Sequence, residues 1–304
     1  MWRNNRGISR IGRFAPSPTG DPHFGSLLAA VASYLQARSG GGRWLVRIED
    51  IDPPREIAGS ATRILNDLER FGLQSDFPVL YQSTRRSAYQ LALRDLLARD
   101  LAFYCGCTRS DLPKSGVYPG TCRAGLPPGR RPRTVRLRVP DEPVAFTDEV
   151  QGEFREDLEK TVGDFVLWRA DDLPAYHLAV VVDDAFQQVT QVVRGADLLA
   201  STARQIYLQQ CLSLPTPSYA HHPVALNAEG KKLSKRLGSD PLALASPERA
   251  LEAALHFLGQ PCPRGLGLEG LWQWAMEHWS LAAVPRGAAA GKGGSAFPDA
   301  ETGD

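Results

Sequence analysis

The stretch RFAPSPTGDPHFGS, residues 13–26, decides the fold predicted for this chain. A short apolar run at residues 11–14 is typical of a buried strand, and the helical spacing of apolar residues over 27–37 predicts a helix after the stretch. The stretch is therefore the turn of a strand–turn–helix unit. Its triplet His-Phe-Gly, residues 23–25, falls where the helix begins, and backbone N–H groups at a helix start can bind a phosphate beside an imidazole.

A second motif, KLSKR at residues 232–236, is rich in lysine and can approach the same phosphate from the opposite side. Activation of a carboxylate by ATP needs positioning and neutralisation of phosphate charge, and it needs no protein nucleophile. Each motif alone has a plainer interpretation, a surface histidine or a solvated basic loop, but their joint occurrence with APSPTG favours an ATP site. The expected catalytic residues are His23, Lys232 and Lys235, and the expected ATP-binding residues are His23, Gly25, Ser26 and Lys235.

Strands and helices alternate over much of the chain. We expect a strand at 44–48 followed by a helix at 57–71, and a strand at 188–193 followed by a helix at 198–212. This alternation predicts an α/β fold with a doubly wound parallel, Rossmann-type nucleotide-binding sheet, in which ligands bind outside the carboxyl ends of the strands. Both His23 and Glu49 follow the carboxyl end of a predicted strand.

The middle of the chain interrupts this alternation. A helix over 85–99 is followed by a loop-rich stretch with cysteines and prolines, and by short strands at 134–139 and 144–147. Two helices, at 247–258 and 268–278, follow KLSKR. The predicted organisation is a first catalytic half at 1–82, an inserted subdomain at 83–179, a second catalytic half at 180–240, a helical unit at 241–284 and a disordered tail at 285–304.

Composition excludes several classes of protein. The chain has 304 residues and a net charge of +1, and no window approaches the ~20 consecutive apolar residues of a membrane span. No apolar signal segment stands at the N-terminus, so we expect a cytoplasmic protein. We also expect a monomer. The odd number of cysteines, 5, argues against a disulfide framework and favours a metal site or free thiols.

The motifs resemble the two ATP-binding motifs of class I aminoacyl-tRNA synthetases. APSPTG and VRIEDIDPPR resemble the glutamate branch: glutamyl-tRNA synthetases and, more closely, the shortened glutamyl-Q tRNA(Asp) synthetases, over residues 11–236. The chain departs from the general forms HIGH and KMSKS, because it has HFGS and KLSKR. Ser26 thus replaces the second histidine, and a hydroxyl or backbone group must supply that phosphate contact.

The resemblance implies a glutamate pocket built from Arg13, Phe14, Ala15, Pro16, Ser17, Glu49, Tyr176 and Arg194. Their types suit glutamate, since Glu49 can hold the α-ammonium while Arg13 and Arg194 offer fork geometry to carboxylates. Glu49 as a surface acid and Arg194 as a rim arginine are the alternatives.

Three cysteines in the predicted insertion, Cys105, Cys107 and Cys122, have the makings of a structural zinc site that needs one more ligand. Free cytosolic thiols with Tyr118 packed nearby are the alternative. The resemblance implies Zn²⁺ held by Cys105, Cys107, Tyr118 and Cys122. We expect the other two cysteines, Cys211 and Cys262, to be buried or incidental.

About seventy residues follow Arg236, which leaves no room for a helical anticodon-binding domain in this sequence. The resemblance therefore implies tRNA-independent activation of L-glutamate by ATP, with Mg²⁺, and transfer of glutamate to the queuosine base in the anticodon of tRNA(Asp). A basic run either contacts tRNA phosphates or is a solvated loop: Arg123, Arg130, Arg131, Arg133, Arg136 and Arg138. The alternative functions are a truncated glutamyl-tRNA synthetase charging the 3′ end, a small nucleotidyltransferase, and a non-catalytic RNA-binding paralogue.

Overall fold

The computed structural model describes residues 10–225, 242, 246–287 and 289–290. The KLSKR motif, with Lys232 and Lys235, lies outside the described residues. So do residue 288 and residues 291–304 of the predicted tail.

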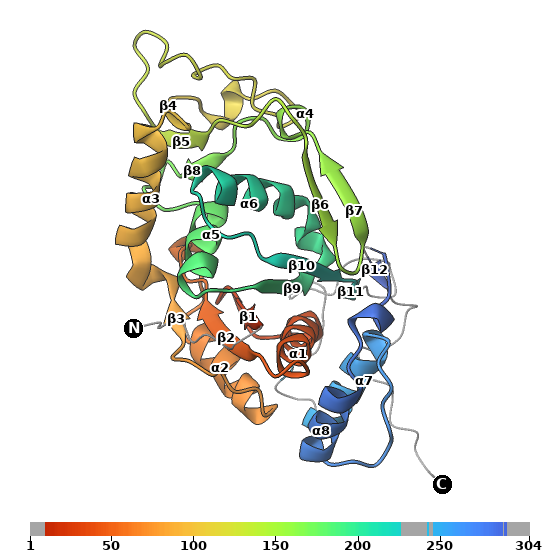
Figure 1. Ribbon diagram of the computed structural model, residues 1–304. Coiled ribbons are helices and arrows are strands. Elements are labelled where there is room, and N and C mark those ends of the chain that lie inside the picture. The colour runs from red at the N-terminus through yellow and green to blue at the C-terminus, as the bar shows by residue number, and fades with distance from the viewer. Residues whose placement is uncertain (1–9, 226–241, 243–245, 288, 291–304) are drawn as a thin grey trace.

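The first catalytic half is a parallel three-stranded sheet with its crossover helices (Figure 1). Its elements are β1 (Ile11–Phe14), α1 (Phe24–Arg38), β2 (Arg43–Ile48), α2 (Ser60–Arg70) and β3 (Leu80–Tyr81). The strands β1 and β2 are almost wholly buried, as expected for a parallel sheet covered on both faces. The helix predicted from residue 57 begins only at Ser60, because Gly59 takes a left-handed conformation, with φ of 76°.

A second sheet, with its helices, adds three parallel strands and one antiparallel edge strand. Its elements are β6 (Val144–Asp148), β7 (Gly152–Glu156), α5 (Tyr176–Phe186), β9 (Gln191–Gly195), α6 (Leu199–Cys211) and β10 (Ser218–His222). β10 pairs in parallel with both β9 and β6, and β7 pairs antiparallel with β6. The two halves meet where β9 contacts β1, and the amide of Thr190 donates to the carbonyl of Ile11 at 3.0 Å.

Helices cover both faces of this sheet. Successive residues of one strand enter different hydrophobic clusters: Val193 packs in the cluster that contains α1, whereas Val192 packs with α5 and α6. Figure 1 shows α1 on one face and α6 on the other. The predicted α/β fold with a parallel sheet is confirmed.

The inserted segment forms a small antiparallel sheet of its own, in the order β4-β5-β8. Its elements are α3 (Arg86–Ala98), β4 (Ala102–Cys105), β5 (Thr134–Leu137), α4 (Leu158–Thr161) and β8 (Val166–Trp168). The hairpin β6–β7 also comes from the predicted insertion, yet it extends the main sheet through β10. The segment 83–179 therefore contributes both a separate sheet and an edge of the central one.

Two C-terminal helices, α7 (Pro247–Phe257) and α8 (Leu268–His278), pack against α1. The indole N–H of Trp279 donates to the side-chain oxygen of Gln36 on α1, and the amide nitrogen of Gln36 donates to Gln191 on β9. Two-residue strands, β11 (Val224–Ala225) and β12 (Ala289–Ala290), pair in parallel, so the described part of the predicted tail includes ordered pairing. In the described residues, no helix is both long and apolar enough to cross a bilayer.

Short 3-10 helices complete the described structure: η1 (Pro53–Arg55), η2 (Gln82–Arg85), η3 (Arg109–Asp111), η4 (Ala196–Leu198) and η7 (Leu281–Ala283).

The turn between α1 and β2 gives a stability prediction. A Cβ on Gly42 would lie 2.4 Å from the carbonyl oxygen of Arg10 and 2.8 Å from that of Ala37, and neither backbone atom can move freely. We expect Gly42→Ala to lower the free energy of unfolding by about 1–3 kcal/mol, measured by urea titration. Gly40→Ala is the matched control, because its Cβ would approach only the far end of the Arg10 side chain, at 3.0 Å, and it should cost clearly less.

Candidate active site

Charged side chains converge where the central strands end. Arg13 lies on β1, Glu49 directly follows β2 and Arg194 lies on β9; each is at most 7% exposed. Tyr176 begins α5 and lies in the electrostatic field of all three. The structure therefore brings together Arg13, Glu49, Tyr176 and Arg194 of the predicted glutamate pocket, at the strand ends where ligands bind in parallel α/β sheets.

A buried carboxylate on α5 organises this group. Asp184 accepts a hydrogen bond from Arg13 Nε at 3.2 Å and pairs with Arg47 Nη1 at 2.8 Å. Arg47 also reaches Glu49, with 3.4 Å between Nη2 and Oε1. Asp184 and Arg47 were not predicted from the sequence; the available signals were a pair of acids inside the apolar run of α5 and the arginine of VRIED.

Burial changes the pKa of the Glu49 carboxyl. Loss of hydration raises the pKa of Glu49 to about 7, although the positive charges of Arg47 and Arg13 oppose the shift. An added cation beside Glu49 would favour its ionised form. The side chain is therefore suited to binding an ammonium group.

Arg194 is held on one edge and unpaired on the other. Its Nε donates to His221 Nε2 at 2.9 Å, and its Nη2 donates to Thr202 Oγ1 at 2.9 Å. Its Nη1 is buried and has no hydrogen-bond partner in the described structure. A buried donor without a partner is costly, and an anionic ligand group would satisfy it.

The predicted phosphate side of the site lies at the N-terminus of α1. His23 is the N-cap residue, and Gly25 lies in the first turn of the helix. The backbone amide of His23 donates to Ser26 Oγ at 3.5 Å, while the amide of Ser26 donates to the His23 carbonyl at 2.8 Å. The Ser26 hydroxyl thus stabilises the helix start at the position where the sequence analysis required a phosphate contact.

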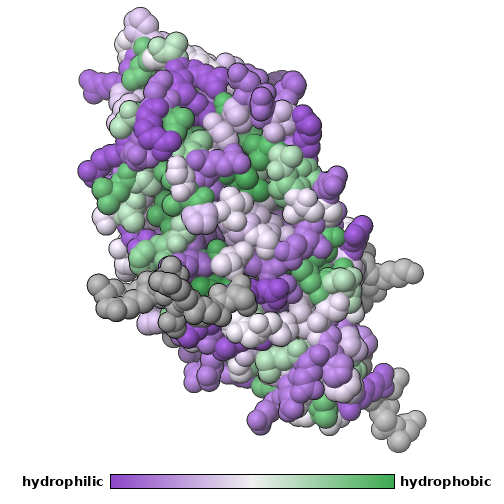
Figure 2. Space-filling view, viewed as in Figure 1, coloured by the Kyte–Doolittle hydropathy of each residue, from purple (hydrophilic) through white to green (hydrophobic). Residues whose placement is uncertain are grey.

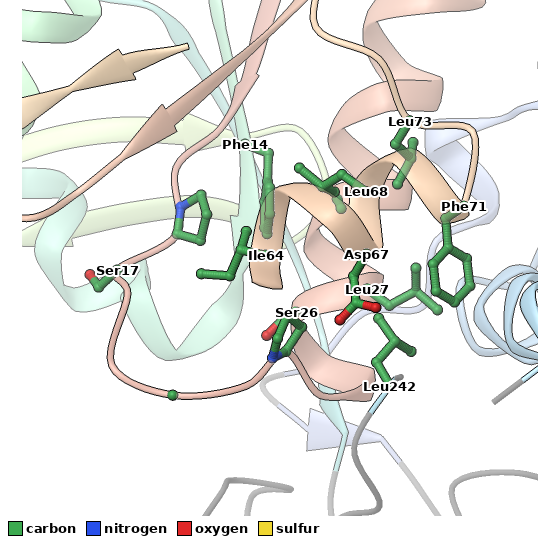
Figure 3. A pocket seen from close by; sticks show the side chains of 14 residues that line it. Phe14, Ser17, Ser26, Leu27, Ile64, Asp67, Leu68, Phe71, Leu73 and Leu242 are labelled. Atoms are coloured by element: carbon green, nitrogen blue, oxygen red, sulfur yellow. The ribbon is translucent and has the colours of Figure 1, made fainter. Parts of the chain in front are cut away.

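A cavity lies on the other side of β1, between the turn, α1 and α2 (Figure 3). Phe14, Pro16 and Ser17 of the predicted glutamate pocket line it, together with Ser26. Asp67 on α2 points toward Leu27 in this view, and burial raises the pKa of its carboxyl. The remaining lining residues are Gly20, Pro22, Leu27, Ala30, Ile64, Leu68, Phe71, Leu73 and Leu242.

The predicted glutamate set is therefore divided between two sides of β1. One group is the charged cluster, and the other consists of the cavity residues. Ala15 joins them in sequence, and a backbone hydrogen bond from Glu49 N to Pro16 O, 2.9 Å long, connects the two sides.

The cysteines of the insertion form a compact buried cluster. The Sγ atoms of Cys105, Cys107 and Cys122 all lie within 4.8 Å of one another. The Tyr118 hydroxyl lies 3.4 Å from Cys105 Sγ. Burial opposes ionisation of the Cys105 thiol, but hydrogen bonds from the Tyr118 hydroxyl and the Cys107 amide outweigh it and bring the pKa of the thiol to about 7. Three thiols at this separation fit the soft, tetrahedral coordination of Zn²⁺.

Most of the basic run is engaged within the protein. Arg136 is buried and donates to the Asp164 carbonyl at 2.7 Å, and Arg138 and Arg130 pair with the carboxylates of Asp100 and Asp111. Arg123 Nη2 donates to the Val139 carbonyl. Figure 2 shows mainly hydrophilic residues at the upper end of the molecule, where Figure 1 places this segment. Arg131 and Arg133 are exposed.

The combination of parallel sheet, charged strand ends and helix N-terminus is typical of α/β enzymes that bind nucleotides. The family model of the class I tRNA synthetases (E and Q), catalytic domain, matches residues 11–115 and 128–243. The chain belongs to this family.

The more specific similarity is to glutamyl-Q tRNA(Asp) synthetases. The protein of that name from Dechloromonas aromatica is 53% identical over 287 residues, covering 90% of this chain and 95% of that protein. The one from Aromatoleum aromaticum is 52% identical and covers 91% and 90%, respectively. A solved structure of a glutamate tRNA ligase from Elizabethkingia meningosepticum, in complex with its amino acid, superimposes with a TM-score of 0.78 at 26% identity, covering 92% of this chain and 66% of that one. The predicted resemblance is confirmed.

The raised pKa of Glu49 predicts a pH-dependent stability. Between its ordinary pKa of 4.5 and about 7, the folded protein keeps a proton on Glu49 that the unfolded chain releases, so stability falls as pH rises through this window. In urea unfolding from pH 5 to 7.5, the free energy of unfolding of the wild type should fall by at most about 1.4 kcal/mol per pH unit through Glu49, and Glu49→Gln should remove this contribution. The control is Glu69→Gln, which alters an exposed acid and should leave the slope unchanged. Equal slopes for wild type and Glu49→Gln would contradict the prediction.

Proposed function

We propose that this protein activates L-glutamate with ATP in the absence of tRNA, and transfers the glutamyl group to the queuosine base in the anticodon of tRNA(Asp). The observation that carries the proposal is the buried meeting of two arginines, Arg13 and Arg194, with Glu49 at the strand ends. This arrangement is complementary to an amino acid with one ammonium and two carboxylates. About 50% identity to glutamyl-Q tRNA(Asp) synthetases over most of the chain supports the choice of acceptor.

The proposed reaction begins with orientation of the substrate. Glu49 holds the α-ammonium, and the guanidinium groups hold the carboxylates. The α-carboxylate then attacks the α-phosphate of ATP in line, which forms glutamyl-adenylate and releases pyrophosphate. His23, the N-terminus of α1 and the lysines of KLSKR are proposed to stabilise the negative charge that spreads over the phosphates. Mg²⁺ bound with ATP would neutralise further charge.

In the second step, a nucleophilic group of the queuosine base attacks the acyl carbon, and AMP leaves. The exposed arginines of the insertion, Arg131 and Arg133, are suited to contacts with tRNA phosphates. Arg136 and Arg138 are assigned a structural role instead, because their guanidinium groups already have protein partners.

We also assign a structural zinc site to the insertion. Cys105, Cys107 and Cys122 supply thiolates, and Tyr118 is the fourth ligand, as implied by the family. Because Phe103 and these four residues form a small core of their own, a bound ion would stabilise that part of the fold.

The acceptor is tested with purified protein, labelled glutamate, ATP and tRNA from cells with and without queuosine. We expect label only on queuosine-containing tRNA, and we expect it to survive removal of the 3′-terminal nucleoside. Pyrophosphate exchange with glutamate should proceed without tRNA. Label that persists without queuosine, or that leaves with the 3′ nucleoside, would instead identify a truncated glutamyl-tRNA synthetase.

The zinc assignment is tested by elemental analysis. We expect about one Zn²⁺ per chain in the wild type, and Cys105→Ser should lower this stoichiometry because one thiolate is lost. Cys211→Ser is the matched control, since Cys211 is a buried thiol on α6 outside the cluster. An unchanged zinc content in Cys105→Ser would remove Cys105 from the ligand set, and the same measurement on Tyr118→Phe tests the phenol.

A further inference from the structure

Three adjacent strands each contribute one buried polar residue to a single row. Arg194 lies on β9, His221 on β10 and Asp148 at the end of β6. Arg194 and His221 are direct partners in the parallel register, whereas Asp148 is the register partner of Tyr219 and reaches His221 through its side chain. The exposed fractions are 5% for Arg194, 0% for His221 and 1% for Asp148. None of the predicted motifs includes His221 or Asp148.

The hydrogen bonds fix the proton positions along this row. An arginine Nε always donates, so His221 Nε2, which lies 2.9 Å from Arg194 Nε, must be an acceptor without a proton. The proton of the neutral imidazole is then on Nδ1, which donates to Asp148 Oδ2 at 2.6 Å. The Asp148 carboxylate therefore selects the one tautomer of His221 that can accept from Arg194.

A second contact completes the support of the guanidinium. Thr202 on α6 accepts from Arg194 Nη2, and its hydroxyl lies 3.3 Å from His221 Nε2, so the two acceptors face the same edge of the guanidinium. Two hydrogen bonds on this edge fix the orientation of the group, and the remaining buried donor, Nη1, has no partner in the described structure. The arrangement prepares one donor for a ligand.

We propose that His221 and Asp148 are positioning residues that hold the Arg194 guanidinium in the orientation that binds a carboxylate of glutamate. The inference rests on the proposed function for the identity of the ligand. Neither residue touches the substrate. Their effect is to restrict the conformations of the Arg194 side chain before glutamate binds. Without them, the entropy lost in ordering this side chain would weaken glutamate binding.

A purely structural role is the competing explanation. Asp148 Oδ1 accepts from the backbone amides of Val150, Gln151 and His221, so Asp148 also shapes the turn between β6 and β7. Substitution of Asp148 would therefore disturb both roles at once. His221 separates them, because its two ring nitrogens have different partners.

Two substitutions at residue 221 test the two ring nitrogens of the imidazole separately. In His221→Asn, the amide nitrogen replaces Nδ1 and preserves the bond to Asp148, but no atom accepts from Arg194. In His221→Gln, the longer side chain places an amide oxygen near the Nε2 position, where it can accept from Arg194, while the bond to Asp148 is lost. The positioning role and the structural role therefore predict opposite orders of the two variants.

The measurement is the dissociation constant of L-glutamate for the full chain by titration calorimetry, alongside that of ATP and the thermal unfolding midpoint. We expect His221→Asn to weaken glutamate binding about tenfold or more, because a hydrogen bond to a charged group is lost, with ATP binding unchanged. His221→Gln should recover most of the affinity. Binding in His221→Asn that equals wild type, or that is tighter than in His221→Gln, would overturn the proposal.

The outcome is separable from that of the proposed function. Wild-type protein that binds glutamate but leaves queuosine-containing tRNA unlabelled would refute the acceptor and leave the positioning role standing. Wild-type protein that binds no glutamate would overturn both. A fall in unfolding midpoint for both variants with equal glutamate affinity would assign His221 to stability alone.

Discussion

The site depends on charge compensation by one buried carboxylate. Asp184 lies between the guanidinium groups of Arg13 and Arg47, and the second of these reaches Glu49. Removal of one partner from such a buried pair typically costs about 3–5 kcal/mol, since a desolvated charge is left unpaired. The α5 helix thus supplies the negative charge that allows two strands to carry cations into the protein interior. A substrate with charges of both signs can then bind where water is scarce.

This compensation links the fold to the chemistry. In a parallel sheet the carboxyl ends of neighbouring strands meet along one edge, so residues that are distant in sequence become neighbours without long loops. Arg13 and Arg194 belong to adjoining strands from the two halves of the domain. The division of the predicted pocket into a charged side and an apolar side has the same origin, because successive side chains of a strand point to opposite faces.

Local patterns made much of this arrangement predictable. The helix expected at 268–278 has those bounds in the structure, and the strand expected at 11–14 is β1, because periodicity and burial agree there. The pairing of β6 with β10 was not predicted, because no local sequence signal indicates which distant strand a given strand will pair with. Asp184 and His221 were missed for a related reason: the charged partners Arg47 and Asp148 lie more than seventy positions away from them in the chain.

The contacts of Gln36 have a consequence for how the protein unfolds. Its side-chain amide accepts from Trp279, directly after α8, and donates to Gln191 on β9, so its two ends are fixed by residues 243 and 155 positions away in the chain. Detachment of the terminal helical pair would leave a buried acceptor without a donor and expose the apolar side of α1. We therefore expect the C-terminal helical pair and the sheet to unfold together rather than separately.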